Sequence, residues 1–217
     1  MCAENTSVVS TSIIGFGSAA FGALSAFALG RWQQRRDEID RNFGALTKTQ
    51  FILFSQWKVV SGLKVYYLDP LRNDKQRFPK VRSRFFLKAP DVPLNEISFI
   101  ANSKNPNLLQ EICDAEQVYL KTRMALDLYN QFRIQFEQSH PPIPGTFDKE
   151  KASGEVIASA FEIGMGNYYL DDLYKQVDLA EPQLLEAIKK IADFIRQHFK
   201  GKKPIKIEAA KKEQAAP

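Results

Sequence analysis

The chain has 217 residues, of which 44% are hydrophobic and 25% charged, a composition that excludes an intrinsically disordered chain. Its two cysteines exclude a disulfide-rich scaffold. The net charge of +5 is unevenly spread, because residues 31–88 hold fourteen Lys and Arg against five Asp and Glu, whereas residues 89–199 hold ten against seventeen. The two halves therefore either attract different partners or pair with each other, within one chain or between copies.

The first element is an apolar segment at residues 8–30. No charged side chain lies between Glu4 and Arg31, and a helix needs about 20 residues to cross the ~30 Å hydrocarbon core of a membrane. A cleaved secretory signal would begin with basic residues, which are absent before this segment. The pattern predicts one transmembrane helix at 8–30, preceded by a short extracytoplasmic N-terminus at 1–7.

Basic residues directly after this segment set its expected orientation. Such residues stay on the cytoplasmic side, so the larger C-terminal part should be cytoplasmic and the N-terminus outside. A bacterial inner membrane is the favoured location, with an organelle membrane left open. The predicted membrane-interface residues are Arg31, Trp32, Arg35 and Arg36. Trp32 has an alternative interpretation, as an aromatic side chain that faces the helical bundle.

Small residues recur at every fourth position of the segment. Ser18, Gly22, Ala26 and Gly30 form this row. Rows of small residues allow two helices to approach closely in lipid, so we expect membrane lipid as a partner and self-association into a homo-oligomer.

A long helix is predicted from Arg31 to Leu68, because no proline interrupts this range. Its side chains follow the alternating four-three spacing of a coiled-coil seam, at Ile39, Phe43, Leu46, Gln50, Leu53, Trp57, Val60, Lys64 and Tyr67. Asp69–Pro70 should end this helix, since the residue before a proline avoids the helical conformation.

The rest of the chain also reads as helical. Residues 70–107 should be irregular apart from a short helix near 95–102. Long helices are expected at 108–138 and 152–178. A further helix should start near Pro182 and stop before Gly201. The fold class is therefore all-α, with the transmembrane helix continuing into a cytoplasmic bundle of about four helices at 31–200. The basic residues 201–217 should form a disordered tail.

A run of basic residues interleaved with phenylalanines lies at 75–88. Polybasic segments near a membrane gain about 1 kcal/mol per Lys or Arg from anionic lipid, so Lys80, Arg82, Arg84, Phe85 and Phe86 are candidate lipid contacts. Contact with nucleic acid is a weaker alternative, because membrane tethering favours lipid. The plainest alternative is a solvated loop whose phenylalanines fill the bundle.

We find no pattern typical of catalysis. The two histidines have no carboxylate or cysteine at metal-ligand spacing, and Glu116, near the apolar face of its helix, lacks the histidine of a Glu-x-x-His motif. Gly164–Met165–Gly166 follows no strand and so is no phosphate loop; a close helix crossing at Gly164 is expected instead. We therefore expect no enzymatic activity and no cofactor.

These observations favour a single-pass, membrane-anchored scaffold that self-associates and recruits a cytosolic protein partner. The alternative is a pore-forming effector, in which the small-residue span assembles in the membrane and the bundle regulates it.

Overall fold

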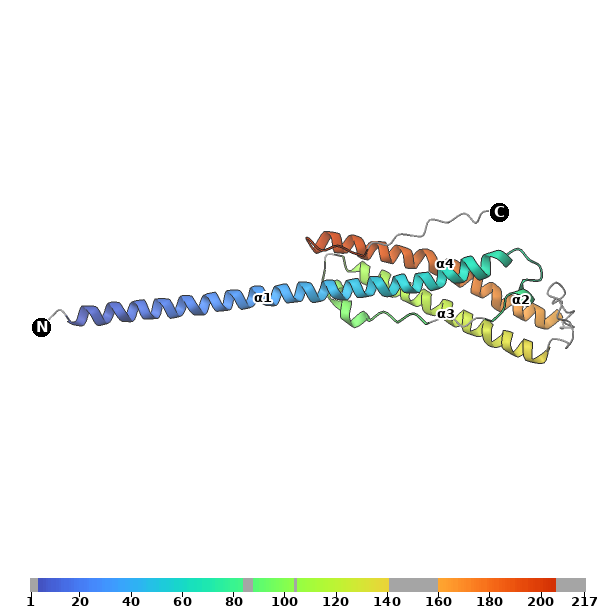
Figure 1. Ribbon diagram of the computed structural model, residues 1–217, viewed down its shortest axis with the longest axis horizontal. Helices are drawn as coiled ribbons and strands as arrows, with labels where there is room; N and C mark the ends of the chain where they lie inside the picture. Colours follow the sequence, from blue (N-terminus) through green and yellow to red (C-terminus); the bar gives the residue numbers. More distant parts are fainter. Residues whose placement is uncertain (1–3, 84–87, 104, 141–159, 206–217) are drawn as a thin grey trace. The chain divides into compact units, whose positions relative to one another are not determined.

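The computed structural model describes residues 4–83, 88–103, 105–140 and 160–205, with side chains described from residue 22 onward. All regular secondary structure in these residues is helical, which confirms the all-α class. The elements are α1 (Glu4–Leu63), η1 (Lys64–Leu68), η2 (Asp69–Leu71), α2 (Arg77–Lys80), η3 (Leu94–Asn102), α3 (Asn107–Ser139) and α4 (Ala160–His198) (Figure 1).

The chain divides into two units at Gly44, within α1. The first unit, residues 1–44, contains the N-terminal part of α1. The second unit, residues 45–217, contains the bundle, in which the C-terminal part of α1 lies with α3 and α4, the three helices running lengthwise (Figure 1). Leu53 of α1, Ile112 of α3 and Ile191 of α4 are fully buried in its core.

The bundle part of α1 follows the predicted seam. Leu46, Gln50, Leu53 and Val60 are all buried, as their four-three spacing requires. The helix continues through the π-helical turn η1, and η2 begins at Asp69–Pro70. The predicted end of the long helix is therefore confirmed.

The predicted transmembrane segment is helical over all of residues 8–30. Among the described residues, however, the structure contains no helix with an apolar stretch sufficient to cross a membrane. The side chains of residues 8–21 lie outside the described set. The membrane span thus has no support from the structure and stays a prediction from the sequence.

The C-terminal helices differ from the prediction, because α4 runs unbroken from Ala160 to His198 with Pro182 inside it. A proline in a helix interior costs about 3 kcal/mol, since it lacks an N–H donor and crowds the preceding turn. Buried side chains on both sides of it, at Val177, Leu184 and Ile188, favour helical packing throughout. The two predicted helices are one from Ala160 onward, so the described part of the bundle has three long helices rather than about four.

The ends of the bundle follow the prediction more closely. The short helix expected near 95–102 is η3, and Gly201 follows α4 with a positive φ of 80°. Ile205, which we expected within the disordered tail, exchanges two hydrogen bonds with the buried amide of Gln50, at 3.1 and 3.4 Å. The predicted tail at 206–217 and the start of the predicted helix at 152 lie outside the described residues.

A close approach occurs at Gly166 and not at the predicted Gly164. A Cβ atom on Gly166 would lie 2.5 Å from the ring of Phe78, whereas one on Gly164 would meet nothing within 4 Å. The Phe78 ring is fully buried, with the rings of Phe132 and Phe136 centred 5.7 and 5.0 Å away. The contact therefore joins α4 to α2, and its ring has little room to move.

We predict that Gly166→Ala lowers the free energy of unfolding by about 1–3 kcal/mol, because the added methyl group overlaps a ring that its neighbours hold in place. Gly164→Ala is the matched control. It should raise the free energy of unfolding by up to about 1 kcal/mol, since alanine favours an exposed helix position over glycine. Urea unfolding followed by circular dichroism measures both, and equal effects of the two substitutions would contradict the proposed crowding.

Candidate functional site

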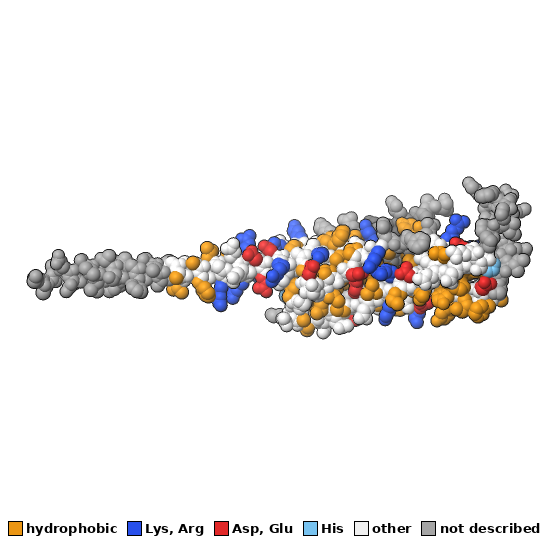
Figure 2. Space-filling model, turned by 90° about the horizontal axis from the view of Figure 1, so that it is seen from below, with side chains coloured by type: hydrophobic (Ala, Val, Ile, Leu, Met, Phe, Trp, Pro, Cys, Tyr) orange, Lys and Arg blue, Asp and Glu red, His pale blue; other side chains and the backbone are white. Residues whose placement is uncertain are grey.

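The N-terminal part of α1 exposes its side chains to a degree that a packed helix does not. Every side chain from residue 22 to 41 is exposed, and these include the large apolar residues Leu24, Phe27 and Leu29, exposed by 68%, 61% and 62%. Figure 2 shows apolar side chains gathered at the start of the described surface, next to Lys and Arg. This surface is the strongest candidate for an interaction site.

The predicted interface residues lie directly after these apolar side chains. Arg31, Trp32, Arg35 and Arg36 occupy successive turns of α1 and are exposed. The Arg31 guanidinium lies 5.0 Å from the centre of the Phe27 ring, and that of Arg36 lies 5.6 Å from the centre of Trp32. Such cation–π contacts contribute about 0.5–1 kcal/mol at exposed sites and hold the aromatic and basic groups side by side.

The structure describes the side-chain environment of three of the four residues in the small-residue row. Gly22, Ala26 and Gly30 are exposed on α1, and a Cβ atom on either glycine would meet nothing within 4 Å. Ser18 is helical, but its side chain lies outside the described set. The row is accessible as predicted for its last three members, and its role in association stays a prediction.

Part of the basic segment makes contacts within the bundle. Lys80, at the end of α2, pairs with Asp74, and Arg77 pairs with Asp171 of α4. Phe78 is fully buried, as in the alternative that phenylalanines of this segment fill the bundle. Arg82 is exposed, while Arg84, Phe85 and Phe86 lie outside the described residues. Lipid contact by this segment stays a prediction.

The uneven charge distribution is partly balanced by contacts inside the bundle. Arg72 donates two hydrogen bonds to the Asp178 carboxylate, at 2.8 and 2.9 Å, and Lys64 lies 2.7 Å from Glu181. The hydrogen bonds from Arg72 lower the pKa of Asp178, and the hydrogen bond to Glu181 raises the pKa of Lys64. Basic residues of 31–88 thus meet acidic residues of 89–199, which is the pairing within one chain that the sequence left open.

A second group of polar residues lies inside the bundle, on α3. Glu116, only 6% exposed, accepts hydrogen bonds from the Gln56 amide of α1 at 2.7 Å and from the Val92 N–H at 3.2 Å. Burial is the largest influence on this carboxyl group and raises its pKa above the ordinary value of 4.5. One turn further, the Tyr119 hydroxyl accepts a hydrogen bond from the Ala89 N–H.

The same face of α3 continues this arrangement toward its C-terminal end. The buried Tyr129 hydroxyl donates to the Val81 carbonyl, and the Arg133 guanidinium donates to the carbonyls of Phe78 and Pro79 at 3.3 and 3.1 Å. Each of these side chains serves a backbone group of the segment between α1 and α3. These buried ionisable groups are therefore structural partners of backbone atoms.

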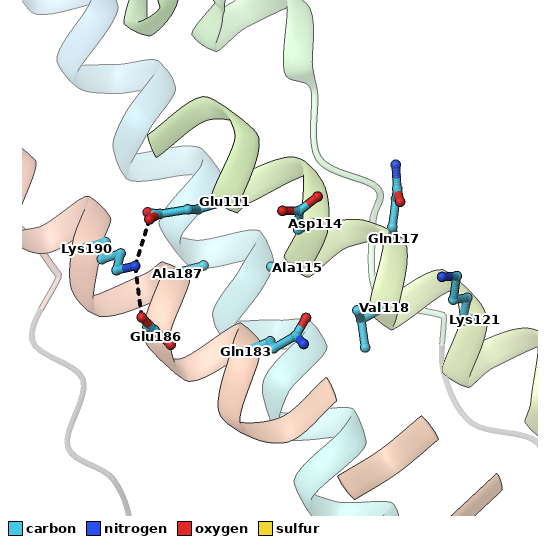
Figure 3. Close-up of a pocket in the computed structure, with 10 residues that line it drawn as sticks. All are labelled: Glu111, Asp114, Ala115, Gln117, Val118, Lys121, Gln183, Glu186, Ala187 and Lys190. Atoms are coloured by element: carbon cyan, nitrogen blue, oxygen red, sulfur yellow. Dashed lines mark hydrogen bonds and ion pairs between the residues drawn. The ribbon is translucent and has the colours of Figure 1, made fainter. Parts of the chain in front are cut away.

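A shallow pocket lies between α3 and α4 (Figure 3). Lys190 of α4 lies at one side of the pocket, and its ammonium group is 2.7 Å from Glu111 and 2.8 Å from Glu186. Asp114, Gln117 and Lys121 line the pocket from α3. Because Lys190 is neutralised by two carboxylates, the pocket offers no concentrated positive charge to an anionic ligand. In the part of the chain that the structure describes, no three His, Cys, Asp or Glu side chains gather where a metal ion could bind.

Comparisons of the chain with models of protein families, with curated proteins and with solved structures give no significant match. The candidate site therefore rests on the sequence and on the geometry described above.

We predict that burial of Glu116 makes stability depend on pH. Because its folded-state pKa is raised, the ionised carboxylate destabilises the fold, and the free energy of unfolding should rise as Glu116 takes up a proton. Relative to Glu116→Gln, which cannot titrate, the wild-type protein should gain stability as the pH falls from 8 toward 4.5, by about 1.4 kcal/mol for each unit of upward pKa shift.

Urea unfolding of both proteins at a series of pH values measures this difference, in which the titration of all other groups largely cancels. A difference between the two proteins that does not change with pH would contradict the raised pKa.

Proposed function

We propose that this chain is a membrane-anchored helical interaction protein. Residues 8–30 cross a membrane once with the N-terminus outside, and residues 31–200, which include the helical bundle, lie on the cytoplasmic side. The protein self-associates and holds a cytosolic partner at the membrane. The observation that carries the proposal is the lack of any charge between Glu4 and Arg31 in a continuously helical segment.

Exposure in α1 supports the anchor. Helices in water gain most of their stability from packing one face against other elements, yet Leu24 and Phe27 are both more than half exposed. A lipid environment removes such side chains from water at about 25 cal/mol per Å² of apolar surface. The charged residues begin at Arg31, where the predicted span ends, and basic groups at that position fit a cytoplasmic boundary.

The bundle supports an interaction role rather than a chemical one. Several of its described ionisable groups are engaged in ion pairs such as Arg72–Asp178 or in backbone contacts such as Glu116–Val92. The pore-forming alternative is disfavoured, because residues 8–30 contain no polar side chain beyond Ser and Thr to line a water-filled channel.

We predict that the full chain resists extraction from membranes by alkaline carbonate. Phe21→Arg combined with Leu24→Arg should move it to the soluble fraction, because an arginine near the centre of a span costs about 2.5–3.5 kcal/mol. Gln33→Arg combined with Gln34→Arg adds the same charge beyond the span and should leave the protein in the membrane. Complete extraction of the unmodified chain would contradict the proposed anchor.

Orientation is tested separately with thiol chemistry. In a Cys113→Ser background Cys2 is the single cysteine. We predict that a membrane-impermeant maleimide labels Cys2 in intact cells without permeabilisation, because the N-terminus lies outside. A variant with Cys2→Ser, Cys113→Ser and Lys200→Cys should be labelled only after permeabilisation. The reverse pattern would place the bundle outside.

A further inference from the structure

The spacing that buries α1 within the bundle also occurs before the bundle begins. Counting back from Leu46 in alternating steps of three and four residues leads first to Phe43 and then to four exposed residues, Ile39, Arg36, Trp32 and Leu29. We call these four residues the N-terminal seam. In a heptad written abcdefg, Leu29 and Arg36 occupy a positions, and Trp32 and Ile39 occupy d positions.

The apolar members of the N-terminal seam are exposed in the described part of the single chain. Leu29, Trp32 and Ile39 are 62%, 58% and 50% exposed, whereas Leu46 and Leu53 at equivalent positions of the same helix are fully buried. All members of the N-terminal seam lie in the first unit, residues 1–44, where α1 is the one described element. A partner that fits this face is a helix with the same spacing.

Charges beside the seam indicate that this partner is a second copy in parallel orientation. Arg35 occupies a g position and Asp40 the e position five residues later. In a parallel pair of helices these two positions face each other across the interface, so a symmetric dimer forms two Arg35–Asp40 pairs. In an antiparallel pair g faces g and e faces e, and Arg35 does not meet Asp40.

Arg36 adds information on oligomeric state. It is the one charged member of the N-terminal seam, and in a parallel dimer the two copies of Arg36 flank the same level of the interface. A single polar residue at an a position lowers the stability of a coiled coil while fixing its register and number of strands. The long arginine side chain also lets its charged end reach water at the edge of a two-stranded interface.

We propose that the N-terminal seam is a homodimer interface, in which residues 29–43 of two copies form a short parallel coiled coil. This deepens the self-association in the proposed function by naming its surface, orientation and stoichiometry. Two copies inserted in one membrane with the same orientation enter the cytoplasm parallel, so the anchor and the coiled coil favour the same arrangement.

Cysteine crosslinking of the full chain tests the geometry. In a background of Cys2→Ser and Cys113→Ser, Trp32→Cys and Ile39→Cys are each introduced alone and oxidised in mild detergent. A parallel dimer brings each new thiol next to its copy, within the Cα separation of about 4.4–6.8 Å that a disulfide requires. Both variants should therefore form crosslinked dimers of twice the 24.7 kDa chain mass.

Gln34→Cys is the matched control, because Gln34 occupies an f position on the opposite side of the helix. It should crosslink at least tenfold more slowly than the two seam variants. Equal rates at all three positions would overturn the proposal. Crosslinking at only one of positions 32 and 39 would also overturn it, because an antiparallel pair brings identical residues together only near its centre.

An exchange of charges between positions 35 and 40 tests the same parallel pairing without crosslinking. The double variant also controls for an effect of Arg35→Asp on folding. Arg35→Asp should weaken dimerisation about tenfold, because two ion pairs become two repulsive contacts. Arg35→Asp combined with Asp40→Arg should restore it, and Arg41→Asp at an f position should have little effect. Sedimentation of the full chain in detergent measures all three, and failure of the double variant to recover would contradict the parallel pairing.

The membrane anchor and the dimer can fail separately. A chain that resists carbonate extraction but stays monomeric overturns the dimer alone. A chain that dimerises through positions 32 and 39 but is extracted by carbonate overturns the anchor alone.

Discussion

The bundle depends on hydrogen bonds between buried side chains of α3 and the backbone of the segment between α1 and α3. The helices described in this segment are short, so many of its N–H and C=O groups have no partner within regular structure, and each buried one left unpaired would cost about 1–3 kcal/mol. Glu116, Tyr119, Tyr129 and Arg133 supply the missing partners at successive turns of α3. The segment is thereby fixed along the helix, with Val92 near one end and Phe78 near the other.

This arrangement explains why the bundle tolerates ionisable groups in its interior. A buried carboxylate is costly unless hydrogen bonds replace its water, and Glu116 receives two, from Gln56 and from Val92. Those bonds do not fully offset the loss of solvent, since burial still raises its pKa. Arg133 gains a further favourable contact, because its guanidinium also lies 5.2 Å from the centre of the Phe78 ring. These charged groups hold the connecting segment in position.

Much of the fold could be predicted from spacing, while the pairing of elements could not. The four-three rhythm around Leu46 and Leu53 identified the buried face of α1, and Asp69–Pro70 identified its end, because both signals are local. The sequence shows Gln50 on that face, but not that its amide binds the backbone of Ile205, 155 residues away. The effect of Pro182 was predicted wrongly for the same reason, since the burial of Val177, Leu184 and Ile188 around it, which a local pattern does not show, favours a helix that continues through it.

For the candidate interaction surface, the sequence and the structure each supply a different part of the description. Its membrane assignment comes from the sequence alone, while its exposure could be judged only from the structure, because a periodic apolar face is equally compatible with a buried helix. Ile39 and Leu46 occupy equivalent positions in one rhythm, yet Ile39 is half exposed and Leu46 is fully buried. Where the apolar seam continues beyond the bundle, its side chains expose apolar surface to water, which is unfavourable. The continuation of the apolar pattern into residues 29–39, where Leu29, Trp32 and Ile39 are exposed, is therefore the feature that supports the proposed dimer.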